Sequence, residues 1–203
     1  QREKQAEVLI KNKMKSNKNI LIIIIVIVCV IGLIIGSFVG KYNSIVTKEE
    51  TVSEAMSNVD TALQRRADLI PNLVSTVKGY ASHEQDAIDK VSEARTKLMN
   101  AESMSDKAKA NDELSSAITK VLALQENYPD LKADKVFIGL QDELAGSENR
   151  IAVARKDYNS SVKDYNAYIK KFPTNIIANM SGHGTKEYFK ASESAKDVPE
   201  VSF

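Results

Sequence analysis

The chain contains few of the residues that build disulfide-bonded, metal-binding or strand-rich proteins. Its 203 residues include one cysteine, two histidines, four prolines, eight glycines and no tryptophan. The single cysteine, Cys29, excludes an intramolecular disulfide, so the folded part depends on its apolar core. The scarcity of proline and glycine favours long helices over strands joined by tight turns.

Motifs for catalysis are also missing from the sequence. His83 and His183 lie in separate segments, and His83-Glu84 lacks the second histidine that a helical zinc site would place four residues later. The sequence has no glycine-rich phosphate loop and no recognisable nucleophile motif. We therefore predict that the protein is not an enzyme and holds no cofactor or metal.

The charge balance gives no reason to expect nucleic acid as a partner. The chain carries 28 basic and 27 acidic residues, of which six basic and two acidic residues precede residue 20. The remainder has 22 basic and 25 acidic residues, or a net charge of about −3. Binding to nucleic acid relies on an excess of positive charge, which this part lacks.

What the chain does have is one apolar run, residues 20–39, without a single charged side chain. At about 1.5 Å of helical rise per residue, about twenty residues cross the roughly 30 Å hydrocarbon core of a bilayer. A buried helix of a soluble core rarely lacks every charged residue over this length. We predict a transmembrane helix over residues 20–40, with the lipid bilayer as its first partner.

The charges that flank this run predict its orientation. Residues 1–19 carry a net charge of +4, whereas only Lys41 follows closely on the other side. Basic flanks stay in the cytoplasm, so we expect a single-pass cell-membrane protein with its C-terminal domain outside the cytoplasm. No Ala-x-Ala pattern closes the run, which favours an uncleaved anchor. Met14 resembles a native start, and residues 1–13 are then an upstream extension.

Three glycines of the predicted transmembrane helix are spaced by four residues: Gly32, Gly36 and Gly40. This spacing permits close approach of two helices in lipid. One interpretation is a homo-oligomer formed through this face. The alternative is that the glycines have no role in association, because glycine is common in membrane helices.

Residues 41–172 carry apolar side chains at heptad spacing, as in helical bundles and coiled coils. The clearest examples are Ile45, Val52, Val59 and Leu73 in the first segment, and Phe137, Leu144, Ile151 and Tyr158 in the last. The pattern predicts helices over residues 41–80, 83–100, 106–127 and 132–171. Gly79 and the capping pattern Ser82-x-x-Gln85 predict the first reversal.

The predicted fold class is all-α, with the transmembrane helix followed by an antiparallel up-down four-helix bundle whose first and last helices are long. Helix lengths support this topology, because a reversal near residues 79–82 lets the ends of the four helices meet. The alternative is three long helices, in which a first helix kinked at Pro71 continues through Leu98.

Charged residues interrupt the apolar stripes and need partners there. Arg66 lies in a core row of the first helix, while Glu148 and Arg155 lie in the last. Counting levels along antiparallel helices places Arg66 near Glu148 and Arg155 near Asp60. We predict that these two ion pairs set the register of the helices.

Two long motifs resemble the LemA family. The first is Leu63-Gln64-Arg65-Arg66-Ala67-Asp68-Leu69-Ile70-Pro71-Asn72-Leu73-Val74, and the second runs from Leu140 through Arg155 to Tyr158-Asn159, Tyr165-Asn166 and Phe172-Pro173. The resemblance covers nearly all of residues 42–203, with a departure at Gly182-His183-Gly184. It implies a short N-terminal membrane anchor and a helical-bundle body. It implies no enzymatic activity, because the family has no established biochemical function.

Residues 173–203 differ in character from the preceding helices. Residues 174–180 are expected to form a short helix closed by Gly182, and the remainder reads as an extended tail. One interpretation places this tail in a groove of its own bundle, and the other offers it to a partner. Because the last helix returns toward the membrane, we expect Phe189 and Phe203 to touch lipid or another membrane protein.

The sequence as a whole favours a scaffold or adaptor of the cell envelope, with other membrane or envelope proteins as partners. The alternative is a binding module for an extracytoplasmic ligand or polymer. Its candidate surface consists of Arg65, Arg66, Asp68, Asn72 and Asn149.

Overall fold

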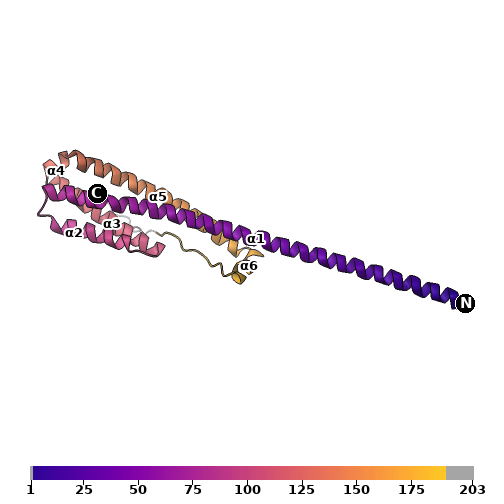
Figure 1. Cartoon of the computed structure of the whole chain (residues 1–203). Helices are drawn as coiled ribbons and strands as arrows, with labels where there is room; N and C mark the ends of the chain where they lie inside the picture. Colours follow the sequence, from indigo (N-terminus) through magenta and orange to yellow (C-terminus); the bar gives the residue numbers. More distant parts are fainter. Residues whose placement is uncertain (1, 191–203) are drawn as a thin grey trace, which may run out of the picture.

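A computed structural model describes the backbone of residues 2–190 and the side chains of residues 21–190, and over this range the chain is helical without strands. The first helix, α1 (Arg2–Tyr80), is 79 residues long. It forms a rod whose N-terminal part extends far beyond the other helices (Figure 1). The remaining helices gather along the C-terminal half of α1, and we call residues 41–190 the body.

The extended part of α1 carries the apolar run. Among the described side chains, α1 is the one helix long and apolar enough to cross a membrane, with a window of mean hydropathy 3.3 that is entirely unburied. Large aliphatic side chains from Leu21 to Val39 are exposed around the helix. This surface indicates membrane anchoring. The helix continues through Lys41 into the body without a break.

The first reversal occurs where the sequence predicts it. α1 ends at Tyr80, and α2 (Gln85–Met99) begins five residues later, so the alternative of a helix that continues through Leu98 is wrong. Pro71 lies inside α1 on an exposed face. The predicted capping box does not form, because Glu84 is the N-cap of α2 and gives no side-chain cap bond.

Two well-formed caps define the next helices. Ser103 caps α3 (Met104–Ala123) by accepting a hydrogen bond from the backbone N–H of Asp106 at 3.0 Å. Asp134 caps α5 (Lys135–Lys170) by accepting from Phe137 N–H at 2.8 Å. This cap separates α5 from the short α4 (Pro129–Ala133), so the helix predicted over residues 132–171 begins three residues later than expected. A 3-10 turn, η1 (Leu124–Glu126), follows α3.

The helices pack in a few clear pairs. α1 packs most extensively against α5, and the two run antiparallel (Figure 1). α2 packs against α3 and against α1, while α6 (Thr174–Met180) covers α1 and α5 near the base of the body. These contacts establish an all-helical body. Its description as an up-down four-helix bundle stays a prediction.

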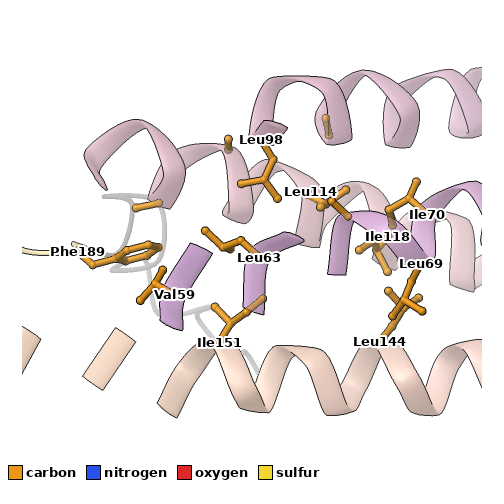
Figure 2. Close-up of a cluster of buried hydrophobic side chains, with 14 of the residues drawn as sticks. Val59, Leu63, Leu69, Ile70, Leu98, Leu114, Ile118, Leu144, Ile151 and Phe189 are labelled. Carbon is orange, nitrogen blue, oxygen red and sulfur yellow. The ribbon is translucent and has the colours of Figure 1, made fainter. Parts of the chain in front are cut away.

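The core follows the heptad positions that the sequence displays. Ile45, Val59 and Leu73 of α1 are fully buried, as are Phe137 and Ile151 of α5. Figure 2 shows how α2 and α3 add to this core through Leu98, Leu114 and Ile118. Since the described part of the chain has one cysteine, on the exposed apolar part of α1, the burial of these side chains holds the body together.

Candidate functional site

A buried arginine joins three helices in the middle of the body. Arg66 of α1 is 4% exposed, and it donates hydrogen bonds of 2.9 Å to Asn111 and to Ser115, both on α3. It also forms an ion pair with Glu148 of α5. The structure therefore brings together the Arg66 and Glu148 that the sequence pairs, and it adds partners from α3 that the sequence did not indicate.

The electrostatics of Arg66 indicate a structural role. Burial lowers its pKa, while the carboxylates of Glu148 and Asp112 raise it. An arginine stays protonated in proteins, so its charge needs these partners permanently. A side chain held by three helices at once sets how α1, α3 and α5 are aligned.

The predicted pairing of Arg155 with Asp60 is wrong. Asp60 accepts instead from Lys107 of α3 at 2.6 Å. The guanidinium of Arg155 lies over the ring of Phe189, 4.5 Å from its centroid. Counting helical rise along α1 and α5 alone could not reveal that α3 contacts Asp60 and that the tail contacts Arg155.

Two exposed residues of the predicted ligand-binding surface, Arg65 and Asp68, have nearby partners of their own. Arg65 lies 3.6 Å from the carboxylate of Glu143 on α5. Gln64 donates to Asp68 at 2.8 Å within α1. Asn72 is exposed one turn further along α1.

Asn149 lies apart from these residues. It is on α5, in a shallow groove that is lined also by Asn58, Arg150, Val153, Ala154 and Asp157. Arg66 is buried against α3. Within residues 21–190, the structure therefore does not gather the five predicted residues at one groove.

The most specific polar arrangement involves residues for which the sequence predicts no role. Two asparagines of α5 each make two hydrogen bonds to the backbone of one tail residue. Asn159 accepts from Phe189 N–H at 2.8 Å and donates to the Phe189 carbonyl at 2.9 Å. Asn166 accepts from Lys186 N–H and donates to the Lys186 carbonyl, both at 2.9 Å. An asparagine amide can satisfy both backbone groups at once, as a neighbouring strand would.

A tyrosine precedes each asparagine and contacts the same segment. Tyr158 donates to the carbonyl of Glu187 at 2.8 Å, and Tyr165 donates to the carbonyl of Gly184 at 3.0 Å. Both rings are buried, and burial raises the pKa of each phenol above its ordinary value of 10.0. The two phenols are therefore protonated donors at neutral pH.

The spacing of the two Tyr-Asn pairs matches the repeat of an extended chain. The pairs are seven residues apart on α5, which is about 10.5 Å along a helix. Their tail partners are three residues apart, which is about 10 Å along an extended backbone. We call Tyr158, Asn159, Tyr165 and Asn166 the backbone clamp, because six hydrogen bonds hold residues 184–189 antiparallel to α5.

One apolar side chain completes this contact. Phe189 is 2% exposed and joins the same core as Val59 and Leu63 of α1 (Figure 2). The expectation that Phe189 touches lipid is wrong, because the chain turns at Gly182 (φ +77°) and runs back along the body. The part of the tail up to residue 190 lies against its own body, while Phe203 lies outside the described residues.

A second polar cluster holds the tail to α1 near the base of the body, the end from which the apolar run extends. Glu49 accepts from Lys186 at 2.5 Å and contacts the His183 ring nitrogen at 2.7 Å. The His183 ring also lies edge-on to Tyr42, with 5.9 Å between centroids. The hydrogen bond from Lys186 lowers the pKa of Glu49 below its usual 4.5, against an opposing contribution from burial, and His183 lowers it further.

The sequence contained the signal for the clamp. Tyr158-Asn159 and Tyr165-Asn166 repeat at heptad spacing, and two of these four residues are amides on an otherwise apolar row. Helical periodicity shows that they share a face. It cannot show that a distant extended segment lies on that face.

Comparison with known proteins places the chain in a family. The model of the LemA family matches residues 55–203. Protein LemA of Metamycoplasma hominis is 28% identical over 188 residues, covering 91% of this chain and 84% of that protein. The residues matched by the family model include the backbone clamp and the tail segment that it binds.

Relatives with another name are about as similar. Magnetosome proteins MamQ 1 and MamQ 2 of Paramagnetospirillum magneticum are each 25% identical over 194 residues, covering 83% of this chain and 71% of those proteins. Magnetosome protein MamQ of Magnetospirillum gryphiswaldense is 24% identical over 188 residues, covering 80% of this chain and 69% of that protein.

Removing the partner of Arg66 is expected to destabilise the body. Glu148→Ala leaves the buried guanidinium without its carboxylate, and because Glu148 is itself 45% exposed, the free energy of unfolding should fall by about 1–3 kcal/mol. Glu143→Ala, which removes only the exposed contacts with Arg65 and Arg150, is the control and should cost less than about 1 kcal/mol. Equal denaturant midpoints for the two variants would contradict the role of Arg66.

Breaking one half of the clamp is expected to free the tail locally. Asn159→Leu removes both hydrogen bonds to Phe189, and a local loss of about 1–2 kcal/mol should speed hydrogen exchange of residues 184–190 about 5–30-fold. Asn149→Leu, on an exposed position of the same helix, is the matched control. Unchanged exchange in Asn159→Leu would show that the clamp does not hold the tail.

The Glu49 cluster should make tail attachment sensitive to acid. Since the folded pKa of Glu49 lies below its ordinary 4.5, its stabilising contribution is complete above that pH and is lost as pH falls through the folded pKa. The drop in melting temperature between neutral pH and the range below 4.5 should therefore be smaller in Glu49→Gln than in the unchanged chain. Glu50→Gln, at the exposed neighbouring position, should keep the full drop, and an equally reduced drop there would refute the assignment.

Proposed function

The chain belongs to the LemA family, and from this premise we propose that it is a membrane-anchored scaffold or adaptor of the cell envelope without catalytic activity. The N-terminus is cytoplasmic in this proposal, and the body is an antiparallel four-helix bundle outside the cytoplasm. The names of its relatives, LemA and MamQ, are not enzyme names, which supports a non-catalytic role.

The continuity of α1 is the observation that carries the proposal. One helix, α1, contains both the apolar run and residues 41–80 of the body, with no break between the two parts. The stretch from Lys41 to Tyr80 is about 60 Å long at 1.5 Å per residue. A rigid rod of this kind holds protein surface at a defined distance from the membrane, which is what a scaffold requires.

The backbone clamp supports an adaptor role. Its six hydrogen bonds to residues 184–189 all go to main-chain groups, so they recognise an extended conformation more than a particular sequence. Proteins that bind extended segments of partners use the same main-chain recognition. The body thus has a surface suited to extended segments, which its own tail occupies.

The ligand-binding alternative has less support. Its five candidate residues are divided between a buried ion pair and separate exposed positions of α1 and α5. No single observation in the described part of the chain directs them toward one ligand.

Limited proteolysis of whole cells tests the sidedness on which the envelope role depends. A protease added outside should digest the body while a cytoplasmic marker stays intact, because the basic residues before the apolar run hold the N-terminus inside. Opening the envelope should then add no further cleavage of the body. A body that is protected until the envelope is opened would refute the assigned orientation.

Photo-crosslinking in intact membranes tests the adaptor role. A crosslinker at Val153, an exposed position of the body, should capture the same membrane proteins from replicate preparations. A crosslinker at Cys29, within the apolar run, reports contacts in the lipid phase as the control. Capture of lipid alone at Cys29 and of nothing at Val153 and at other exposed body positions would contradict an adaptor role.

A further inference from the structure

An unusual apolar surface lies at the base of the body. Outside the apolar run, Phe172 and Met180 are the most exposed large hydrophobic side chains of residues 21–190, at 81% and 74%. Ile176, between them, is 49% exposed. Ile176 and Met180 lie on α6 and Phe172 lies two residues before it, and we call Phe172, Ile176 and Met180 the α6 apolar face.

The opposite side of α6 fixes the orientation of this face. Thr174, Ile177 and Ala178 are buried, and α6 packs against both α1 and α5. The α6 apolar face therefore cannot turn inward without removing these residues from the core. It stays directed away from the body.

Contacts on both sides of α6 place it beside the end of the apolar run. Before α6, the Tyr168 ring lies 5.8 Å from the ammonium of Lys41 and 5.5 Å from that of Lys48. After α6, the ring of His183 lies against Tyr42. Lys41 and Tyr42 come directly after the apolar run, which ends at Val39.

The antiparallel course of α5 carries the chain from Tyr168 toward the apolar run. α5 ends at Lys170, about 3 Å beyond Tyr168 at helical rise, and Phe172 follows two residues later. Figure 1 shows α6 at the end of the body from which the N-terminal part of α1 extends. The α6 apolar face thus lies at the level where a membrane surface would begin.

The polar residues around this face also suit a membrane surface. Lys170 and Lys171 are exposed immediately before Phe172, and Tyr42 and Tyr168 lie at the same level of the body. Basic side chains attract anionic headgroups, and tyrosines are enriched where membrane meets water. The base of the body therefore combines apolar, aromatic and basic side chains.

We propose that the α6 apolar face inserts into the headgroup region of the bilayer that α1 crosses, so that the body is attached to the membrane at two points. This inference rests on the membrane anchor of the proposed function. One helix alone leaves the body free to rotate about its axis. A second contact, at Phe172, Ile176 and Met180, fixes which side of the body faces the membrane.

The bilayer is the occupant that the geometry favours over a second copy of the chain. The face lies at the end of the body from which the apolar run extends, which is where the anchor itself places a bilayer. Amphipathic segments at this level bury their apolar side chains about 5–10 Å deep, at the boundary between headgroups and acyl chains.

The absence of tryptophan makes the test direct, because each substitution to tryptophan adds a single fluorescent probe. The full chain with Phe172→Trp, or with Met180→Trp, is reconstituted in vesicles of phosphatidylcholine and phosphatidylglycerol. A fraction of the lipid carries a nitroxide quencher near its glycerol backbone. Both positions are highly exposed, so the substitutions leave the core unchanged, and thermal melting verifies this.

Two further variants provide the controls. Phe38→Trp lies within the apolar run near the same level, and it reports whether the chain is anchored. Val136→Trp, at the far end of α5, is 61% exposed and reports quenching by distant lipid. We expect Phe172→Trp and Met180→Trp to lose emission to a similar extent as Phe38→Trp, and Val136→Trp to keep its emission.

The outcomes separate failure of this inference from failure of the anchor. If Phe38→Trp is quenched while Phe172→Trp or Met180→Trp is not, the anchor stands and the second membrane contact is refuted. If none of the variants is quenched, the anchor itself is refuted, and this inference with it. If Phe172→Trp escapes both the lipid quencher and soluble iodide, protein covers the face and the bilayer is excluded as its occupant.

Discussion

Burial of apolar side chains between α1 and α5 is the interaction on which the rest of the body depends. Ile45, Val59 and Leu73 on one helix belong to the same apolar cluster as Phe137 and Ile151 on the other, and all five are fully buried. Because heptad spacing keeps these residues on one face of each helix, the two helices stay in contact along the whole body. No disulfide supports them within the described residues, so packing supplies the stability.

Polar residues along this contact define the alignment of the helices, which apolar packing leaves undetermined. Apolar stripes alone allow two helices to slide by a turn, whereas Arg66 finds Glu148, Asn111 and Ser115 together in one alignment only. The backbone clamp acts similarly on the tail. Its asparagines pair with Lys186 and Phe189, and a shift by one residue would move Phe189 out of the core.

The base of the body joins three features that the sequence places far apart. The apolar run ends next to Tyr42, α5 ends at Lys170, and the chain turns back after α6 at Gly182. His183 and Lys186 then return to Glu49 on α1. A helix that leaves the membrane, a helix that returns to it and the start of the tail therefore support one another at the level where we place the membrane surface.

The sequence by itself determined the elements that depend on local periodicity. The apolar run, the heptad stripes and the short helix at residues 174–180 all follow from side-chain spacing and turn residues. The reversal after Tyr80 was the favoured of two alternatives, and the structure decided between them. The proximity of Arg66 and Glu148 also followed, because two antiparallel helices of known rise allow levels to be counted. The cap at Asp134 was missed, since its effect depends on one local hydrogen bond rather than on a pattern.

Only the tertiary structure decided which segments lie against one another. It placed α3 against Asp60 and Arg66, moved Phe189 from the expected lipid surface into the core, and showed what Asn159 and Asn166 bind. These contacts join residues that are 20–49 positions apart. Helical periodicity tells which face a residue occupies, but the neighbour on that face is selected by the packing of the whole chain.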